Sequence, residues 1–140
     1  MLYNLLTPAI KSSSVNWASL ILRVGMGVLM IPHGYGKLER FEGLSTRFMD
    51  FMGLGSSTSL ILAIFAELVC SILLVLGFCT RAIIIPLIIT MITAAFVAHA
   101  DDPLSDKEHS LMYLTAYLAI FILGTGKYSI DALLFKKRAY

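Results

Sequence analysis

Hydrophobic residues fall into four long runs along the chain, and each run ends at polar, glycine or proline residues. The runs cover residues 17–38, 58–79, 82–99 and 108–124, and each is close to the ~20 residues that a helix needs to cross a bilayer. Composition agrees, because 58% of the 140 residues are hydrophobic and 14% are charged, whereas roughly a quarter are charged in an ordinary soluble domain. The pattern predicts an all-α integral membrane protein, a four-helix bundle that forms one transmembrane domain over residues 1–140.

Two shorter stretches have the pattern of helices that lie in the membrane interface. Between the first two spans, apolar side chains from Phe41 to Met52 recur at three- and four-residue steps, and the charged residues fall off that stripe. The stretch "YSIDALLFKKR", which follows the fourth span, is similar and has a basic end. We expect one short interfacial helix between the first two spans and another at the C-terminus.

The distribution of basic residues predicts the orientation. With four spans both termini lie on one side, which carries six Lys and Arg residues near the span ends against four on the other side. By the positive-inside rule both termini are cytoplasmic, in a membrane of the bacterial inner or plasma membrane type. The net charge of +2 indicates no nucleic acid partner. The basic residues at positions 136–138 favour contact with anionic membrane lipids.

Two charged residues lie well inside the predicted spans. Arg23 is in the first span and Glu67 is in the second. Each charge at a helix centre costs roughly 2.5–3.5 kcal/mol on insertion scales, so intramembrane charges usually face partners inside the bundle. We expect Arg23 and Glu67 to form a structural ion pair, although their depths differ by ~9 Å at 1.5 Å per residue. If they do not meet, Glu67 is expected to be protonated.

A polar cluster is predicted in the outer half of the bundle. His33 in "PHGYGK" and His99 lie ~24 and ~25 Å above the cytoplasmic ends of their helices, and therefore at one level. Proline and two glycines beside His33 are expected to bend or unwind the first helix and to open a cavity. The residues predicted to bind a ligand there are His33, Lys37, Glu67, His99, Glu108 and Tyr113.

Several kinds of chemistry have no support in the spacing of residues. Cys70 and Cys79 lie nine positions apart on one predicted helix, too far for a disulfide and unlike a C-x-x-C motif. No H-x-x-x-H or E-x-x-H spacing links His33, His99 and Glu108, so no metal site is predicted. No haem, flavin or iron–sulfur pattern is present. Electrons for any redox reaction must therefore come from a partner or from a cofactor that the sequence does not reveal.

Three segments resemble the DoxX family of small four-helix membrane proteins. They are "LILRVGMGVLMIPHGYGKL", "AELVCSILLVLGFCTRAIIIPL" and "GTGKYSIDALL". The matching positions are Arg23, His33, Lys37, Glu67, Arg81 and Asp131. The resemblance implies a membrane subunit of a quinone-linked oxidoreductase, or a protein of resistance to quinones, catechols or thiol stress. Related four-helix proteins proposed to be chaperones or cargo receptors show that catalysis does not follow from the resemblance.

The leading hypothesis is that the protein binds a quinone or another lipophile as a subunit of a redox or detoxification system. His33 is the candidate donor to a quinone carbonyl and Glu67 the candidate proton carrier, which makes them the candidate catalytic residues. A protein partner or a second copy of the chain is expected, and whether the chain is an enzyme stays open. The alternatives are a non-catalytic membrane chaperone or assembly partner and, third, a small-molecule transporter.

Overall fold

The computed structural model describes residues 12–134, which are helical and contain no strand. The first long helix is α2 (Ser12–Glu39), followed by the short α3 (Phe41–Leu44). A second long helical segment consists of α4 (Ser56–Ile64), the π-helix η1 (Phe65–Cys70) and α5 (Ser71–Leu76). The remaining elements are α6 (Thr80–Thr93), the π-helix η2 (Ala94–Ala98), α7 (Leu104–Leu123) and α8 (Ile130–Leu134).

Within residues 12–134, three helical segments are long and apolar enough to cross a membrane, namely Ser12–Glu39, Ser56–Leu76 and Thr80–Ala98. These segments contain most of the first three predicted spans, which confirms the prediction of an all-helical membrane protein. The fourth predicted span lies within α7, which is 20 residues long. Asp106, Lys107 and Glu108 make the first turns of α7 polar, and this helix is not one of the three segments.

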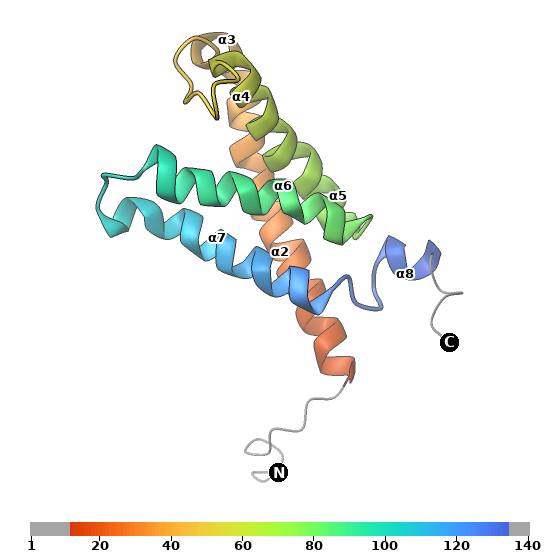
Figure 1. Ribbon diagram of the computed structural model, residues 1–140. Coiled ribbons are helices and arrows are strands. Elements are labelled where there is room, and N and C mark those ends of the chain that lie inside the picture. The colour runs from red at the N-terminus through yellow and green to blue at the C-terminus, as the bar shows by residue number, and fades with distance from the viewer. Residues whose placement is uncertain (1–11, 135–140) are drawn as a thin grey trace.

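The long helices pack as two antiparallel pairs that cross each other (Figure 1). In one pair α2 lies along the segment α4–η1–α5, and in the other α6–η2 lies along α7. The pairs meet where α6 contacts η1 and α7 contacts α2. The buried core at this crossing includes Met30, Leu74, Ile84, Leu87 and Ile120. Many large apolar side chains on the outer faces are exposed, as expected for helices in lipid.

Glycines set the close approach of α2 to the second helical segment. A Cβ at Gly34 would lie 2.6 Å from the backbone N of Leu68, and one at Gly27 would lie 2.6 Å from Val75 Cγ2. Small residues allow this kind of backbone approach between membrane helices. The first span is expected to bend or unwind here, and the second of these outcomes is wrong, because α2 is continuous through Pro32, Gly34 and Gly36. Gly34, the residue after His33, serves a helix–helix contact.

The two predicted interfacial stretches contain only short helices. Phe41–Leu44 forms α3, and the rest of the connection to α4 is made of turns, with Met52 at a φ of 57°. In the stretch after α7, Ile130–Leu134 forms α8, and residues 135–138 lie outside the described part of the chain. Asp131 fixes α8 to the turn between α5 and α6, because its carboxylate accepts hydrogen bonds from the backbone N–H groups of Cys79 and Thr80.

Candidate functional site

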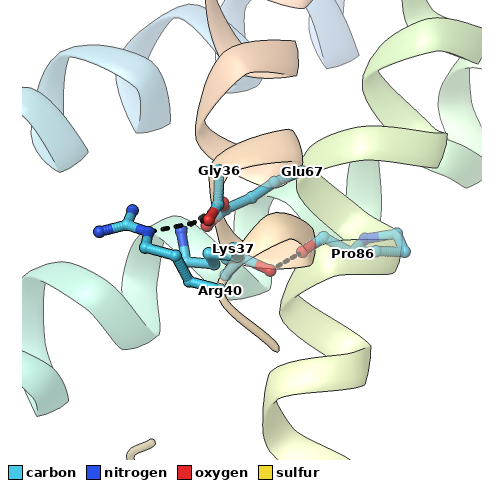
Figure 2. A network of polar contacts seen from close by, with 6 residues as sticks. Gly36, Lys37, Arg40, Glu67 and Pro86 are labelled. Carbon is cyan, nitrogen blue, oxygen red and sulfur yellow. Dashed lines mark hydrogen bonds and ion pairs between the residues drawn. The ribbon is translucent and has the colours of Figure 1, made fainter. Parts of the chain in front are cut away.

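Lys37 and Glu67 form an ion pair between the last turns of α2 and the π-helix η1. Lys37 Nζ lies 2.5 Å from Glu67 Oε2, and the two side chains are 24% and 6% exposed. Figure 2 shows this contact beside Gly36, Arg40 and Pro86. Gly34, three residues before Lys37 in α2, brings the α2 backbone against Glu67 and Leu68. The close approach places the lysine within reach of the carboxylate.

The predicted Arg23–Glu67 ion pair is wrong. Arg23 lies 14 residues before Lys37, which is ~21 Å along the helix axis, so it reaches the opposite end of the neighbouring helices. Its guanidinium donates hydrogen bonds to the backbone carbonyls of Leu74 and Tyr128. Arg23 is therefore a structural residue that links α2 to the end of α5 and to the segment after α7.

A cavity of about 440 Å³ adjoins the Lys37–Glu67 ion pair. Its walls come from α2, the connection before α4, the segment α4–η1, and α6–η2 with the following residue His99. Most of the lining side chains are apolar, and Lys37, Glu67 and His99 are the ionisable ones among them. Binding sites for small molecules typically have this character, with apolar walls and a few convergent polar groups in roughly 300–1,000 Å³.

Both π-helical segments border this cavity. Phe65, Ala66 and Glu67 of η1 line it on one side, and Ala94 and Ala98 of η2 line it on another. A π-helical turn is rare and is found frequently at functional sites, because the extra residue changes the direction of the side chains around it. In this protein one such turn carries Glu67. Because two rare π-helical segments border this one cavity, we take the cavity as the candidate site.

His99 lies at the C-terminal end of η2 and lines the same cavity. Its Nδ1 is 2.7 Å from Asp102 Oδ2, and both side chains are partly exposed. This contact fixes the ring and leaves Nε2 as the second nitrogen available for hydrogen bonding. Thr90 also lines the cavity, but its hydroxyl donates to the carbonyl of Pro86, one turn earlier in α6.

His33 belongs to a separate group of aromatic side chains between α2 and α7. Its ring centroid lies 6.2 Å from those of His109 and Tyr113, and these two are also 6.2 Å apart. Tyr113 is 5.8 Å from Tyr117, by ring centroids. His33 and His109 are exposed, whereas both tyrosines are buried.

The family model for DoxX matches residues 18–100 of this chain. The chain belongs to the DoxX family. It is 31% identical over 124 residues to "Inner membrane protein YqjF" of Escherichia coli (strain K12), with 84% of this chain and 92% of that protein covered. It is 25% identical over 126 residues to "Putative oxidoreductase CatD" of Bacillus subtilis (strain 168), with 89% and 92% covered. No solved structure matches the chain.

The ligand-binding residues predicted for this DoxX protein fall into two groups. Lys37, Glu67 and His99 come together at the cavity, whereas His33 and Tyr113 lie in the aromatic group. Glu108 is exposed near the start of α7, outside the cavity lining. The expectation that His33 and His99 share one site is wrong, because equal depth along two helices does not fix the direction in which each side chain points.

Two features of the DoxX site escaped sequence reasoning. His109 joins the aromatic group because it lies four residues before Tyr113, one turn along α7. The π-helical turns have no recognised signal in the hydrophobic pattern.

Among residues 12–134, no three His, Cys, Asp or Glu side chains are close enough together to hold a metal ion.

Proposed function

We propose that this DoxX protein binds a quinone or a similar lipophilic molecule in the cavity beside Lys37 and Glu67, as a membrane subunit of a redox or detoxification system. The observation that carries the proposal is an apolar cavity among membrane-spanning helices with an ion pair in its wall. A ring with a polar edge and an apolar body matches such a cavity in size and in polarity.

The outer wall of the cavity supports access from the lipid phase. Leu62 of α4, Phe65 of η1 and Ile89 of α6 all line the cavity, and all three are also exposed on the outer surface. Because both helical segments are apolar enough to span a membrane, these side chains face lipid. A ligand dissolved in the bilayer reaches the cavity between the second and third helical segments without entering water.

The polar groups supply what a quinone carbonyl needs. Lys37 has three N–H donors, and one of them is directed at Glu67, so others are available to a ligand oxygen. Glu67 is positioned to exchange a proton with that oxygen, and His99 offers a further polar contact. Glu67 thus keeps its proposed role as proton carrier. The role of carbonyl donor passes from His33 to Lys37, because His33 does not line the cavity.

Electrons are supplied from outside the chain in this proposal. The sequence has no haem, flavin or iron–sulfur pattern, so a protein partner or a bound cofactor must provide them. The name of the Bacillus subtilis relative, "Putative oxidoreductase CatD", agrees with a redox context. A purely structural partner of another protein remains the competing function, in which the cavity has no specific ligand.

We further propose that α7 is the fourth membrane crossing of a bacterial inner membrane protein. Its 20 residues extend ~30 Å as an α-helix, about the thickness of the hydrocarbon core. In this arrangement both termini are cytoplasmic and the cavity lies in the outer half of the membrane. The polar first turns of α7 then lie at the outer interface.

Mass spectrometry of an organic extract tests the ligand proposal. The protein is purified in mild detergent beside an unrelated four-span protein that is prepared identically. We expect a quinone or another lipophile at close to one molecule per chain, enriched over the control. The proposal is overturned if there is no enrichment and if a short-chain benzoquinone also fails to bind saturably to the detergent-purified protein.

A further inference from the structure

Two buried hydroxyl groups near Glu67 have no hydrogen-bond partner among the residues that the structure describes. Ser71 Oγ and Tyr117 Oη are fully buried, and neither makes a hydrogen bond within the part of the chain that the structure describes. A buried polar group without a partner costs free energy. Ordered water satisfies such groups in many proteins, provided that the site offers two or more polar partners.

These two hydroxyls lie next to each other and close to Glu67. Tyr117 packs in the same buried cluster as Cys70, the residue before Ser71, and as Leu74, three residues after Ser71. Ser71 follows Glu67 by four residues in one continuous helical segment, so the two side chains are neighbours on one helix face. Tyr113 and Tyr117 of α7 pack in one buried cluster with Cys70 and Leu74 of this same segment.

The aromatic group extends this row of polar side chains to the surface. From Tyr117 the centroid distance to Tyr113 is 5.8 Å, and from Tyr113 to each of His33 and His109 it is 6.2 Å. None of these side chains lines the cavity. Glu67 is the one residue that belongs both to the cavity wall and to the end of this row.

We propose that a buried water bridges Ser71 and Tyr117 and completes a proton path from the exposed His33–His109 pair, through Tyr113, to Glu67. Histidines and hydroxyl groups are suited to this role because each accepts a proton on one side and releases one on the other. Chains of such groups mark proton relays in membrane proteins. The path rests on the proposed function, in which Glu67 exchanges protons with the bound molecule.

The transfer moves protons only and leaves every side chain in its original oxidation state. A proton taken up at the histidine pair displaces one along the hydroxyls and the water, and the Glu67 carboxylate becomes a carboxylic acid. Lys37 of α2 is the charged group that contacts Glu67. Ser71 follows Glu67 by four residues in the same helical segment, and Tyr113 and Tyr117 of α7 belong to the buried cluster next to it.

Time-resolved infrared spectroscopy after a rapid drop in pH tests this path without any ligand. The protein is placed in nanodiscs, and the carboxylic acid band of Glu67 is identified by its loss in Glu67→Gln. We expect the band to rise at least about tenfold more slowly in Tyr117→Phe and in Ser71→Ala, since a missing proton carrier slows transfer strongly. The final height of the band should not change.

Matched controls are Tyr35→Phe and Ser57→Ala, which remove the same hydroxyl groups from exposed positions on α2 and α4. These variants should keep the wild-type rate. Equal rates in the control variants and the path variants would overturn the proposal. A spectrum in which no band depends on Glu67 would overturn it too, because Glu67 would then take up no proton.

Thermal stability gives a second measurement on the same variant. If Tyr117 Oη had no partner at all, Tyr117→Phe would leave the melting temperature unchanged or raise it. A bridging water predicts a lower melting temperature, because the change leaves Ser71 and the water with one fewer partner. Ligand extraction from each variant separates the two proposals. Slow proton transfer in Tyr117→Phe and Ser71→Ala with ligand retained supports both proposals, whereas slow transfer in these variants with no ligand bound in any sample overturns the proposed function alone.

Discussion

Helix α2 carries two cations into the membrane-spanning part of the protein, and the structure uses them differently. Arg23 is 1% exposed and its guanidinium donates to two backbone carbonyls. A Cβ at Gly77, which has a positive φ, would overlap this guanidinium. Lys37 is 24% exposed, pairs with a carboxylate and borders a cavity of about 440 Å³.

The difference shows that an intramembrane charge is not by itself a sign of a functional site. The planar guanidinium of arginine presents several donors in fixed directions, which suits the carbonyls at the end of a helix and in a following turn. Lysine offers a flexible point charge, and here that charge lies beside open volume. The packing around each cation assigns Arg23 to structure and Lys37 to the candidate site.

Replacement of Arg23 should have the largest effect on stability. In Arg23→Met the carbonyls of Leu74 and Tyr128 lose a charged donor, and we expect a loss of about 3 kcal/mol in the free energy of unfolding. Thermal unfolding in detergent measures it. The control is Arg47→Met, because Arg47 is exposed and donates only to Gly43 within its own turn. Equal melting temperatures for the two variants would contradict a structural role for Arg23.

Gly34→Ala should have the second-largest effect on stability, and it should affect the candidate site as well as the fold. The added methyl group would press on the backbone of Glu67 and Leu68, and such overpacking typically costs about 2 kcal/mol. It should also move Lys37 away from Glu67 and weaken ligand binding. Gly25→Ala is the matched control, since a Cβ there meets nothing within 4 Å. The close contact would be refuted if both variants unfolded at the wild-type temperature.

Lys37→Met and Glu67→Gln should separate binding from stability. We expect the affinity for a quinone analogue to fall about tenfold or more, which corresponds to about 1.4 kcal/mol. The change in melting temperature should be smaller than for Arg23→Met, because the adjoining cavity gives the remaining group room to rearrange. Lys107→Met is the control, since Lys107 does not line the cavity and donates to the backbone carbonyl of Ala100. Unchanged affinity in both site variants would place the ligand elsewhere.

Asp131→Asn should lower the free energy of unfolding modestly. Asp131 lies at the same end of the molecule as Arg23. Both carboxylate oxygens of Asp131 accept backbone N–H groups at the start of α6, and an amide offers only one acceptor oxygen. We expect a loss of about 1 kcal/mol, as for other helix caps, with ligand affinity unchanged. Asp106→Asn serves as the comparison, because Asp106 is exposed and its side chain accepts only from neighbouring Ser105. A fall in affinity would show that the two ends are coupled.

Labelling of Cys79 tests which side of the membrane the Arg23 end of the molecule faces. The measurement depends on neither protein stability nor ligand affinity. Cys79 is exposed on the turn after α5, whereas Cys70 is buried. A maleimide that cannot cross the membrane should label Cys79 in inside-out vesicles and not in right-side-out vesicles. Cys79→Ser should abolish the labelling. The reverse pattern would place the Arg23 end outside and the cavity in the inner half of the membrane.

The sequence alone determined the membrane class, three of the predicted spanning helices and the family resemblance, because length, hydropathy and the DoxX motifs are local properties of the chain. It also singled out Lys37, Glu67 and His99, since charged or polar residues in apolar helices are visible without a structure. Only the tertiary structure decided that Glu67 pairs with Lys37 and that His33 joins His109. These pairings depend on the rotation of each helix, on the close approach at Gly34 and on two π-helical turns, and residue spacing along one chain determines none of these.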